Sequence, residues 1–393
     1  MVPCPRAVED AGPYGEGPGW PRERRAGQAP PLREIGIDYE RTYTEIMDQA
    51  RTRRQKSGAG IVLRRILCVL LVTLLLIGGF LYGVMYMVCK GPSETARDLF
   101  VRSVRETSAI GFLARLYFSE EEIAEIEGSH EDTVVATDAS LIEIAAPAEG
   151  EDGPTADAWG YVDEDGDGLI LVPVSGESYT GYMLIVQDPM RVELGFSPED
   201  MGQRGYTVAE FAEKFGAVAA INGGGFYDPG GMGNGSIPEH LVVKNGQIYA
   251  GELGVGEGFV GLDSKGILHV GLETVDDIKN NDIQHGCGYG PVLVANGEMM
   301  TEGMLVSGLN PRTAIGQRAD GAILMLVIDG RRATSLGASY RDVAEQMVAF
   351  GAMNASNLDG GSSSLMWLNG KYQNNTAAVI GVREIPTTFL VMP

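Results

Sequence analysis

AMNASNLDGGSSSLMWLNGK, residues 352–371, holds two strand-like runs on either side of one polar loop. Asp359 ends the first run, and Gly360, Gly361 and three serines follow it directly. Glycine allows positive φ angles and lets a ligand approach the backbone closely. The segment therefore predicts a β-rich fold in which a carboxylate stands on a loop at the end of a strand.

Short β-rich runs of this kind extend from about residue 168 to the C-terminus, separated by Asn-Gly and related turn sequences typical of hairpins. Two helical stretches interrupt them, at residues 208–215 and 340–350. Strands with few helices predict an α+β fold, a single domain built on an extensive mixed β-sheet with a few helices. We expect a transmembrane helix and a short helical stalk before this domain.

Residues 66–88 contain no charged side chain, and 23 residues of helix would measure about 34 Å, enough to cross a bilayer. The residues before this run include 12 basic and 9 acidic side chains, whereas those after it include 18 basic and 44 acidic ones. Positive charge on the N-terminal side predicts a cytoplasmic N-terminus and a retained single-pass anchor in the cell membrane. The rest of the chain would then be extracytoplasmic.

Four regions follow from this pattern. Residues 1–65 are expected to be a mostly disordered basic tail, 66–88 the anchor, 89–160 a helical stalk with an acidic linker, and 161–393 the β-rich domain. The outer region carries a net charge of −26, which disfavours nucleic acid as a partner. An anionic substrate would therefore need arginines placed locally.

Four polar or glycine-rich loops each follow an apolar run, at residues 217–231, 308–317, 326–332 and 354–364. Three of these runs end in a polar side chain followed at once by glycine: Asn222, Asp329 and Asp359. Asn-Gly and Asp-Gly are also ordinary turn formers, so each loop taken singly could be a turn without chemistry. Four such loops together favour a shared site.

Four segments together resemble the phosphodiester glycosidase family over residues 168–393. They are INGGGFYDPGG from residue 221, NPRTAIGQRADGAILMLVIDGRR from residue 310, SYRDVAEQMVAFGAMNASNLDGGSSSLM from residue 339 and the closing PTTFLV. The resemblance is strongest to membrane-anchored bacterial members. It implies hydrolysis of a sugar from a sugar-1-phosphodiester at the anomeric C–O bond, in cell-wall or exopolysaccharide metabolism.

The residue types suit that reaction. Ordinary glycosidases use two carboxylates, but a departing phosphomonoester needs little protonation, so one acid can suffice. Asp359 is the candidate base or nucleophile, Asp329 a second carboxylate or an orienting partner, and Arg312 the phosphate clamp, while Asn222 would hydrogen-bond the sugar or the phosphate. The candidate substrate contacts are Gly224, Asp228, Arg331, Gly360, Gly361, Ser362 and Ser363. A structural ion pair between Asp329 and Arg312 is the alternative.

Asp163, Asp165 and Asp167 match the start of a calcium-binding loop, but Val174 stands where the bidentate glutamate belongs. A partial calcium site and a solvated acidic turn both fit, and the sequence requires no cofactor. Two other functions stay open: a non-catalytic surface module that binds glycans, and a metal-dependent phosphodiesterase that cleaves the P–O bond. Asp359 and Arg312 together favour the glycosidase.

Overall fold

The structure is a computed structural model that describes residues 39–107, 110–127, 136–144, 155–249, 258–272, 274–301, 305–375 and 381–393. The first 38 residues of the tail and most of the acidic linker lie outside the described residues. The chain divides into two compact units, Met1–Gly78 and Gly79–Pro393.

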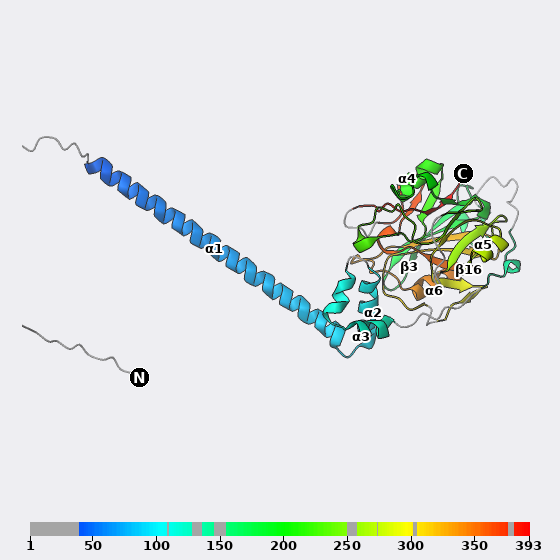
Figure 1. Ribbon diagram of the computed structural model, residues 1–393, viewed down its shortest axis with the longest axis horizontal. Coiled ribbons are helices and arrows are strands. Elements are labelled where there is room, and N and C mark those ends of the chain that lie inside the picture. Colours follow the sequence, from blue (N-terminus) through cyan, green and yellow to red (C-terminus); the bar gives the residue numbers. More distant parts are fainter. Residues whose placement is uncertain are drawn as a thin grey trace, which may run out of the picture. The chain divides into compact units, whose positions relative to one another are not determined.

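Helix α1, Tyr39–Lys90, contains the expected span (Figure 1). An 18-residue window within residues 60–90 has a mean hydropathy of 2.6, and this segment is long and apolar enough to cross a membrane. The helix begins well before residue 66, in the segment expected to be mostly disordered. Helix propagation from an established helix costs far less than nucleation, so the Glu-, Arg- and Gln-rich segment before the span extends it.

The helical stalk consists of α2 (Glu94–Arg105), the 3-10 helix η1 (Gly111–Leu116) and α3 (Glu120–Glu127). Ser93 caps α2 by accepting a hydrogen bond from the Ala96 N–H. The apolar side chains of these helices pack with Cys89 into a small core of their own. The stalk is thus a separate helical module with its own packing.

Three antiparallel sheets make up the β-rich domain. The seven-stranded sheet has the order β13-β12-β16-β14-β15-β4-β3, and the two five-stranded sheets have the orders β18-β17-β6-β19-β5 and β10-β9-β11-β7-β8. A short hairpin of β1 (Thr155–Ala156) and β2 (Val162–Asp163) precedes them. The first sheet contains β3 (Leu169–Ser175), β4 (Thr180–Val186), β12 (Val292–Ala295), β13 (Glu298–Met299), β14 (Arg312–Arg318), β15 (Ile323–Ile328) and β16 (Ala352–Leu358).

The second sheet contains β5 (Val192–Gly195), β6 (Ala219–Asn222), β17 (Met366–Leu368), β18 (Lys371–Tyr372) and β19 (Thr388–Val391). The third contains β7 (Val242–Lys244), β8 (Gln247–Ile248), β9 (Phe259–Asp263), β10 (Leu268–His269) and β11 (Ile283–Gly288). The α+β class is confirmed, but the expectation of one mixed sheet is wrong. Every strand pairing among the described residues is antiparallel, both where a short turn joins the two strands, as between β3 and β4, and where they are far apart in the chain, as between β4 and β15.

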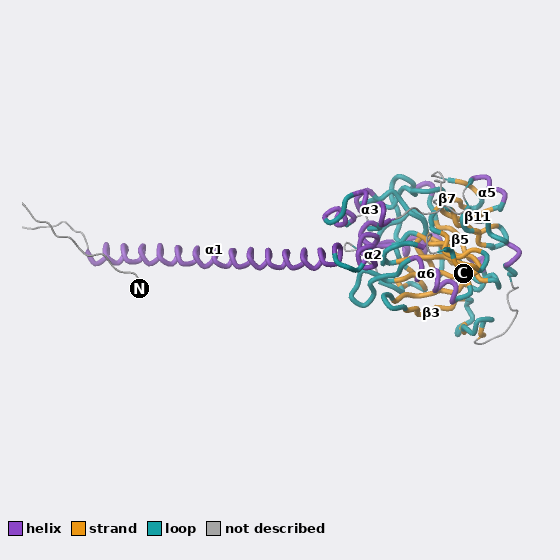
Figure 2. Tube along the Cα trace, turned by 90° about the horizontal axis from the view of Figure 1, so that it is seen from below, coloured by secondary structure: helices purple, strands orange, loops and turns teal. Residues whose placement is uncertain are grey.

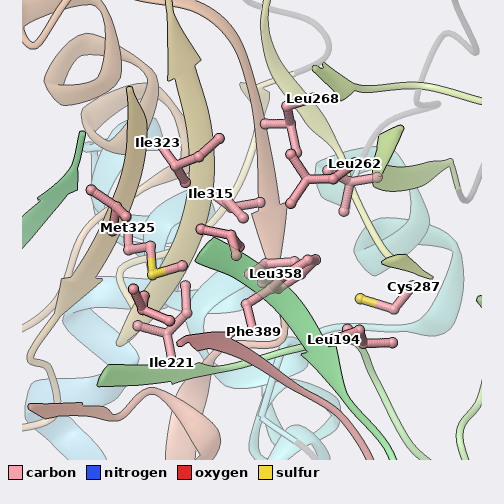
Figure 3. Packing of buried hydrophobic residues seen from close by; sticks show 14 of the residues in the cluster. Leu194, Ile221, Leu262, Leu268, Cys287, Ile315, Ile323, Met325, Leu358 and Phe389 are labelled. Carbon is pink, nitrogen blue, oxygen red and sulfur yellow. The ribbon is translucent and has the colours of Figure 1, made fainter. Parts of the chain in front are cut away.

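One central core lies between the three sheets, and Figure 3 shows labelled side chains from all of them meeting there. In β15 the residues alternate: Ile323, Met325 and Val327 belong to this core, whereas the residues between them face an outer cluster. Both faces of the strand are therefore buried, which explains its uninterrupted apolar sequence.

A helix covers the outer face of each sheet. The helix α6 (Tyr340–Ala349) packs on the seven-stranded sheet, α4 (Val208–Phe215) on the sheet that contains β6, and α5 (Val275–Asn280) on the sheet that contains β11. Figure 2 shows α5 beside β7 and β11. The two helical stretches expected from the sequence correspond to α4 and α6. Because the helices cover the sheet faces, the strand ends and their loops stay available for a site.

Candidate active site

Three of the predicted residues meet at one edge of the seven-stranded sheet. Arg312 is the first residue of β14 and pairs with Ile328, the last residue of β15. The next residue of β14, Thr313, pairs with Leu358, the last residue of β16. Asp329 and Asp359 follow directly after those two strands. Antiparallel register therefore brings the start of one strand and the ends of its two neighbours together, as the spacing of the loops predicted.

Asn222 joins this edge to the neighbouring sheet. Its side-chain Nδ2 donates to the backbone carbonyl of Asp359 at 2.6 Å. Its Oδ1 accepts from the Thr313 hydroxyl at 2.7 Å and from the Leu365 N–H at 3.2 Å. Asn222 is 0% exposed, and these bonds occupy both ends of its amide. The structure thus gives Asn222 a positioning role, which differs from the expected contact with sugar or phosphate.

The glycines after Asn222 allow close packing. A Cβ on Gly224 would lie 2.8 Å from the carbonyl oxygen of Gly288, and the Gly224 N–H already donates to the Thr387 hydroxyl. A Cβ on Gly225 would lie 2.9 Å from the Tyr289 ring. Gly224, expected to contact substrate, therefore serves to bring the β6 loop against the end of β11.

The side chain of Asp359 is half-buried. Burial raises its pKa to about 6, against the lowering effects of hydrogen bonds from the Ser363 hydroxyl and the Gly360 N–H. The Tyr289 hydroxyl donates to Oδ1 at 3.4 Å. A carboxyl group with this pKa is ionised at neutral pH and still basic enough to accept a proton, as a general base requires.

Arg312 is buried and fully oriented by the protein. Its Nε donates to the Ala338 carbonyl at 3.0 Å, its Nη2 donates to the Gly308 carbonyl at 2.7 Å, and its guanidinium lies 4.1 Å from the centre of the Tyr340 ring. The ionic partner of Arg312 is Glu106, at the end of α2, with 2.6 Å between Nη2 and Oε2.

Arg331 lies beside Arg312, and burial together with the charge of Arg312 lowers its pKa. Its Nη2 donates to the Thr107 hydroxyl at 2.8 Å. A Cβ on Gly361 would lie 3.2 Å from the same Nη2 atom, which places Arg331 against the loop that carries Asp359. Two guanidinium groups therefore lie next to each other and next to the glycine loop.

Asp228 and Ser362 meet at a third arginine. The Arg383 Nη2 donates to Asp228 Oδ1 at 2.9 Å, and its Nη1 donates to the Ser362 hydroxyl at 3.4 Å. The positive charge of Arg383 lowers the pKa of Asp359, and the negative charge of Asp228 raises it. The Asp359 carboxyl group is therefore influenced by one positive and one negative charge, which act on its pKa in opposite directions.

Asp329 is turned toward the segment that follows β18. Its Oδ1 accepts from Asn374 Nδ2 at 3.2 Å and from the Asn375 N–H at 3.0 Å, and Asn374 Nδ2 also donates to the Ser364 carbonyl at 2.9 Å. These contacts suit the orienting partner better than a second catalytic carboxylate. In the part of the chain that the structure describes, the alternative ion pair with Arg312 is not formed.

Sequence reasoning missed Glu106, Tyr289 and Arg383. Arg383 stands three residues before the closing PTTFLV segment, which is the one local signal that could have drawn attention to it. Tyr289 lies between two glycines at the end of a strand, a pattern shared by ordinary turns. Glu106 lies in the stalk, 206 residues before its partner Arg312, and nothing in the sequence links the two.

Asp163, Asp165 and Asp167 do lie together, with ligand atoms within 4.8 Å of one another. Both carboxylate oxygens of Asp163 already accept from backbone N–H groups of the same loop. The loop leads into β3 at the sheet end where β15 begins, whereas the candidate active site lies where β15 ends. Five strand steps of about 3.3 Å put roughly 17 Å between the two places, so these aspartates do not belong to the site around Asp359.

Residues 215–392 match the family model described as phosphodiester glycosidase. This is the family that the motifs of the sequence predicted, and the matched segment lies within the β-rich domain.

Two curated proteins illustrate the likeness. The SPbeta prophage-derived uncharacterized protein YomE of Bacillus subtilis (strain 168) is 32% identical over 198 residues, which cover 48% of this chain and 30% of that protein. The N-acetylglucosamine-1-phosphodiester alpha-N-acetylglucosaminidase of Bos taurus is 27% identical over 215 residues, which cover 48% of this chain and 39% of that one. The match thus spans well under half the length of either relative.

Among solved structures, the chain is similar to the zebrafish N-acetylglucosamine-1-phosphodiester alpha-N-acetylglucosaminidase catalytic domain auto-inhibited by pro-peptide. The TM-score is 0.50 at 20% sequence identity, and the match covers 64% of this chain and 87% of that one. At this level of identity the likeness shows a shared fold.

Proposed function

We propose that this chain is a membrane-anchored hydrolase that cleaves the anomeric C–O bond of glycosyl-1-phosphodiesters. The observation that carries the proposal is the Asp359 carboxyl group, with its pKa near 6, at a sheet edge shared with two arginines. The family match supports this substrate class. The bovine relative supports it as well, because its name describes hydrolysis of a sugar-1-phosphodiester.

In the proposed reaction Asp359 acts as the general base. It takes a proton from a water molecule whose oxygen forms the new bond to the anomeric carbon, while the electron pair of the breaking C–O bond goes to the phosphate oxygen. The leaving phosphomonoester has a pKa near 6, so it can depart without a protein proton donor. Guanidinium groups bind phosphate through paired, charge-assisted hydrogen bonds, which gives Arg312 and Arg331 their part.

The anchor supports a location for this activity. The apolar helix over residues 60–90 would hold the chain in the cell membrane, with the basic N-terminal side in the cytoplasm and the domain outside. Substrates would then be extracytoplasmic glycosyl phosphodiesters, and polymers of the cell wall or of exopolysaccharides belong in the test panel. The net charge of −26 beyond the span makes the local arginines the sites for an anionic substrate.

The test uses the full chain in detergent micelles and water labelled with ¹⁸O. UDP-GlcNAc and a GlcNAc-1-phosphodiester are the first substrates, with Asp359→Asn as the inactive control. Label on the anomeric oxygen of the released sugar supports the proposal. Label on the phosphate would show P–O cleavage by a phosphodiesterase, and binding of the panel without turnover by any variant would show a glycan-binding module; either result overturns the proposal.

A further inference from the structure

The 3-10 helix η1 of the stalk exposes an apolar face. A 3-10 helix repeats every three residues, so Gly111, Ala114 and Tyr117 form one row. This is the inner row, because Ala114 is buried and Tyr117 packs against the core of the stalk. The outward rows hold three large apolar side chains, which we call the η1 face: Ile110 at 39% exposed, Phe112 at 57% and Leu116 at 58%. Within the described residues nothing buries this face.

The inner row of η1 rests on the last turns of α1. The Tyr117 ring stacks on the Tyr82 ring of α1, with 5.5 Å between the ring centroids. Met85 of α1 also packs against the core of the stalk, and Cys89 belongs to that core with 1% of its surface exposed. The end of the apolar run and η1 are therefore packed together as one unit.

The place of Tyr82 in the apolar run sets the depth of this contact. The apolar layer of a bilayer is about 30 Å thick and takes about 20 helical residues to cross, so a span that starts at Ile66 ends near Met85. Tyr82 then lies about 5 Å inside the outer boundary, and Tyr86 lies at the boundary. Tyrosines are enriched at this level, because the ring is apolar and the hydroxyl reaches water. Tyr117, stacked on Tyr82, lies at the same level.

Charged side chains next to this contact lie further out along α1. Lys90 is the last residue of α1, about 12 Å beyond the tyrosine contact. Its Nζ lies 4.3 Å from the centre of the Phe118 ring and 3.1 Å from Glu122 Oε1. Arg115 is the charged residue in the outward rows of η1, and its long apolar stem lets the guanidinium reach the headgroups. The stalk thus repeats the order of the span, with apolar groups at the acyl chains and charges at the headgroups.

We propose that the η1 face is inserted into the outer interface of the membrane that α1 spans, where it contacts the acyl chains next to the lipid headgroups. The inference rests on the membrane anchor that is part of the proposed function. Lipid is the occupant because Leu116 is the chain neighbour of Tyr117, and Phe112 stands little more than one turn before it, so both lie beside the end of the span. Removing large apolar side chains from water favours this insertion.

Insertion would give the stalk a second attachment to the bilayer besides α1. The stalk contacts the β-rich domain through the ion pair of Glu106 with Arg312. A stalk that is fixed at the interface would therefore hold the domain near the membrane surface, instead of letting it swing about the end of a single helix.

The test measures tryptophan fluorescence of the full chain in lipid nanodiscs that hold one copy each. Phe112→Trp and Leu116→Trp each place a tryptophan on the η1 face, and the wild type gives the background of its 3 tryptophans. Phosphatidylcholine with bromine near the carbonyl end of its acyl chains quenches a tryptophan that touches it. Each variant should lose about half of its added fluorescence in this lipid, and less when the bromine is near the terminal methyl, because the face lies at the boundary.

Met190→Trp is the matched control. Met190 is 57% exposed, as Phe112 is, but it belongs to the 3-10 helix η3 (Pro189–Arg191) of the β-rich domain. This helix follows the end of β4 that pairs with the start of β15, away from Arg312 and the stalk. Its added fluorescence should be the same in all lipids. Leu76→Trp, within the span, should instead be quenched most by bromine near the terminal methyl.

The outcomes separate this inference from the proposed function. Quenching of Leu76→Trp without quenching of either η1 variant would overturn the insertion and leave the anchor standing, whereas an unquenched Leu76→Trp would overturn both. Fluorescence of the η1 variants that changes only when a disc holds two copies would assign the face to a second copy of the chain, which also overturns the insertion. Because the measurement needs no turnover, it gives the same answer whether or not the chain hydrolyses glycosyl phosphodiesters.

Discussion

The side-chain amide of Asn222 donates a hydrogen bond of 2.6 Å to the backbone carbonyl of Asp359, and this bond joins two different sheets. The Asp359 N–H in turn donates to the Gly223 carbonyl at 3.0 Å. The backbone of the candidate catalytic residue is therefore held from both sides by the end of β6. A carboxylate fixed at the junction of two sheets keeps its place without a direct ionic partner.

Replacing this amide should cost stability and activity together. Asn222→Ala leaves the Thr313 hydroxyl and the Leu365 N–H without their acceptor, and we expect a loss of about 2–3 kcal/mol in the free energy of unfolding. It also frees the Asp359 loop, so kcat should fall at least tenfold in protein that is still folded.

Asn354→Ala is the matched control for that variant. Asn354 is equally buried, but it lies near the start of β16, at the far end of the strand from Asp359. Its Oδ1 accepts from the Asn296 N–H at 3.0 Å, so the variant should lose similar stability by chemical denaturation. Its kcat should match the wild type. Equal loss of kcat in both variants would show that Asn222 acts through stability alone.

The pH dependence of both activity and stability should report on Asp359. A base must be ionised, so kcat/KM should rise with pH through about 6, the pKa of this group, and Asp359→Asn should abolish turnover. In the unfolded chain the pKa is near 3.9, so the native state holds its proton more tightly. Wild-type stability should therefore decrease as pH rises from about 4 to about 6.

Asp359→Asn removes that pH dependence. At pH 7.5 the variant should be more stable than the wild type by about 1–3 kcal/mol, and at pH 3.5 the two should be equal. Denaturant titrations at the two pH values measure the difference. A wild type that gains stability between pH 4 and pH 6 relative to the variant would contradict a raised pKa.

Tyr289→Phe should move the same midpoint upward. The Tyr289 hydroxyl donates to Asp359 Oδ1 at 3.4 Å, a long hydrogen bond that favours the ionised carboxylate. Loss of this hydrogen bond should raise the midpoint of the kcat/KM profile by about half a pH unit, which corresponds to the low end of the free energy that one hydrogen bond contributes. Tyr161→Phe should leave the midpoint in place, because Tyr161 stacks on Phe350, before the start of β16 and so at the end of that strand opposite Asp359.

The acidic loop before β3 should be independent of catalysis. Asp163→Ala removes the acceptor of two backbone N–H groups, so the melting temperature should fall. Because the loop lies about 17 Å from the site along the strands, kcat should stay unchanged. Calcium or a chelator should likewise leave kcat as it is. A metal-dependent rate that disappears in Asp163→Ala would refute this separation.

The sequence was sufficient for the features that depend on local pattern. The apolar span, the capped helices α4 and α6, and the loops that carry Asp359 and Arg312 all have signatures within a few residues. The convergence of those loops could be inferred because each follows a strand. The division into three sheets could not, because it depends on pairings such as Asn222 with Thr388, which are far apart in the chain.

The direction in which each side chain points was the second feature that could not be predicted from the sequence. Asn222 and Asp359 both stand at the end of a strand before a glycine, yet Asn222 is fully buried, whereas Asp359 is half-buried and its carboxyl group accepts from the Tyr289 hydroxyl. Nothing in their local sequences distinguishes them. Glu106 shows the same limit at long range, because the helical pattern of α2 predicts its own packing but not the loop on which the helix ends.

Arg383 and Asp228 offer a paired test of the electrostatics around Asp359, because they act on it with opposite sign. Arg383 lowers the pKa of Asp359 and Asp228 raises it, and the two are themselves paired at 2.9 Å. Arg383→Gln should therefore shift the midpoint of the kcat/KM profile to higher pH, and Asp228→Asn should shift it to lower pH. Both shifts should shrink at high salt, because neither charge is fully shielded from solvent. If both single variants shifted the midpoint in the same direction, they would be acting by disturbing the loop and not by charge. A double variant with a midpoint near that of the wild type would show that the two charges offset each other at the carboxyl group.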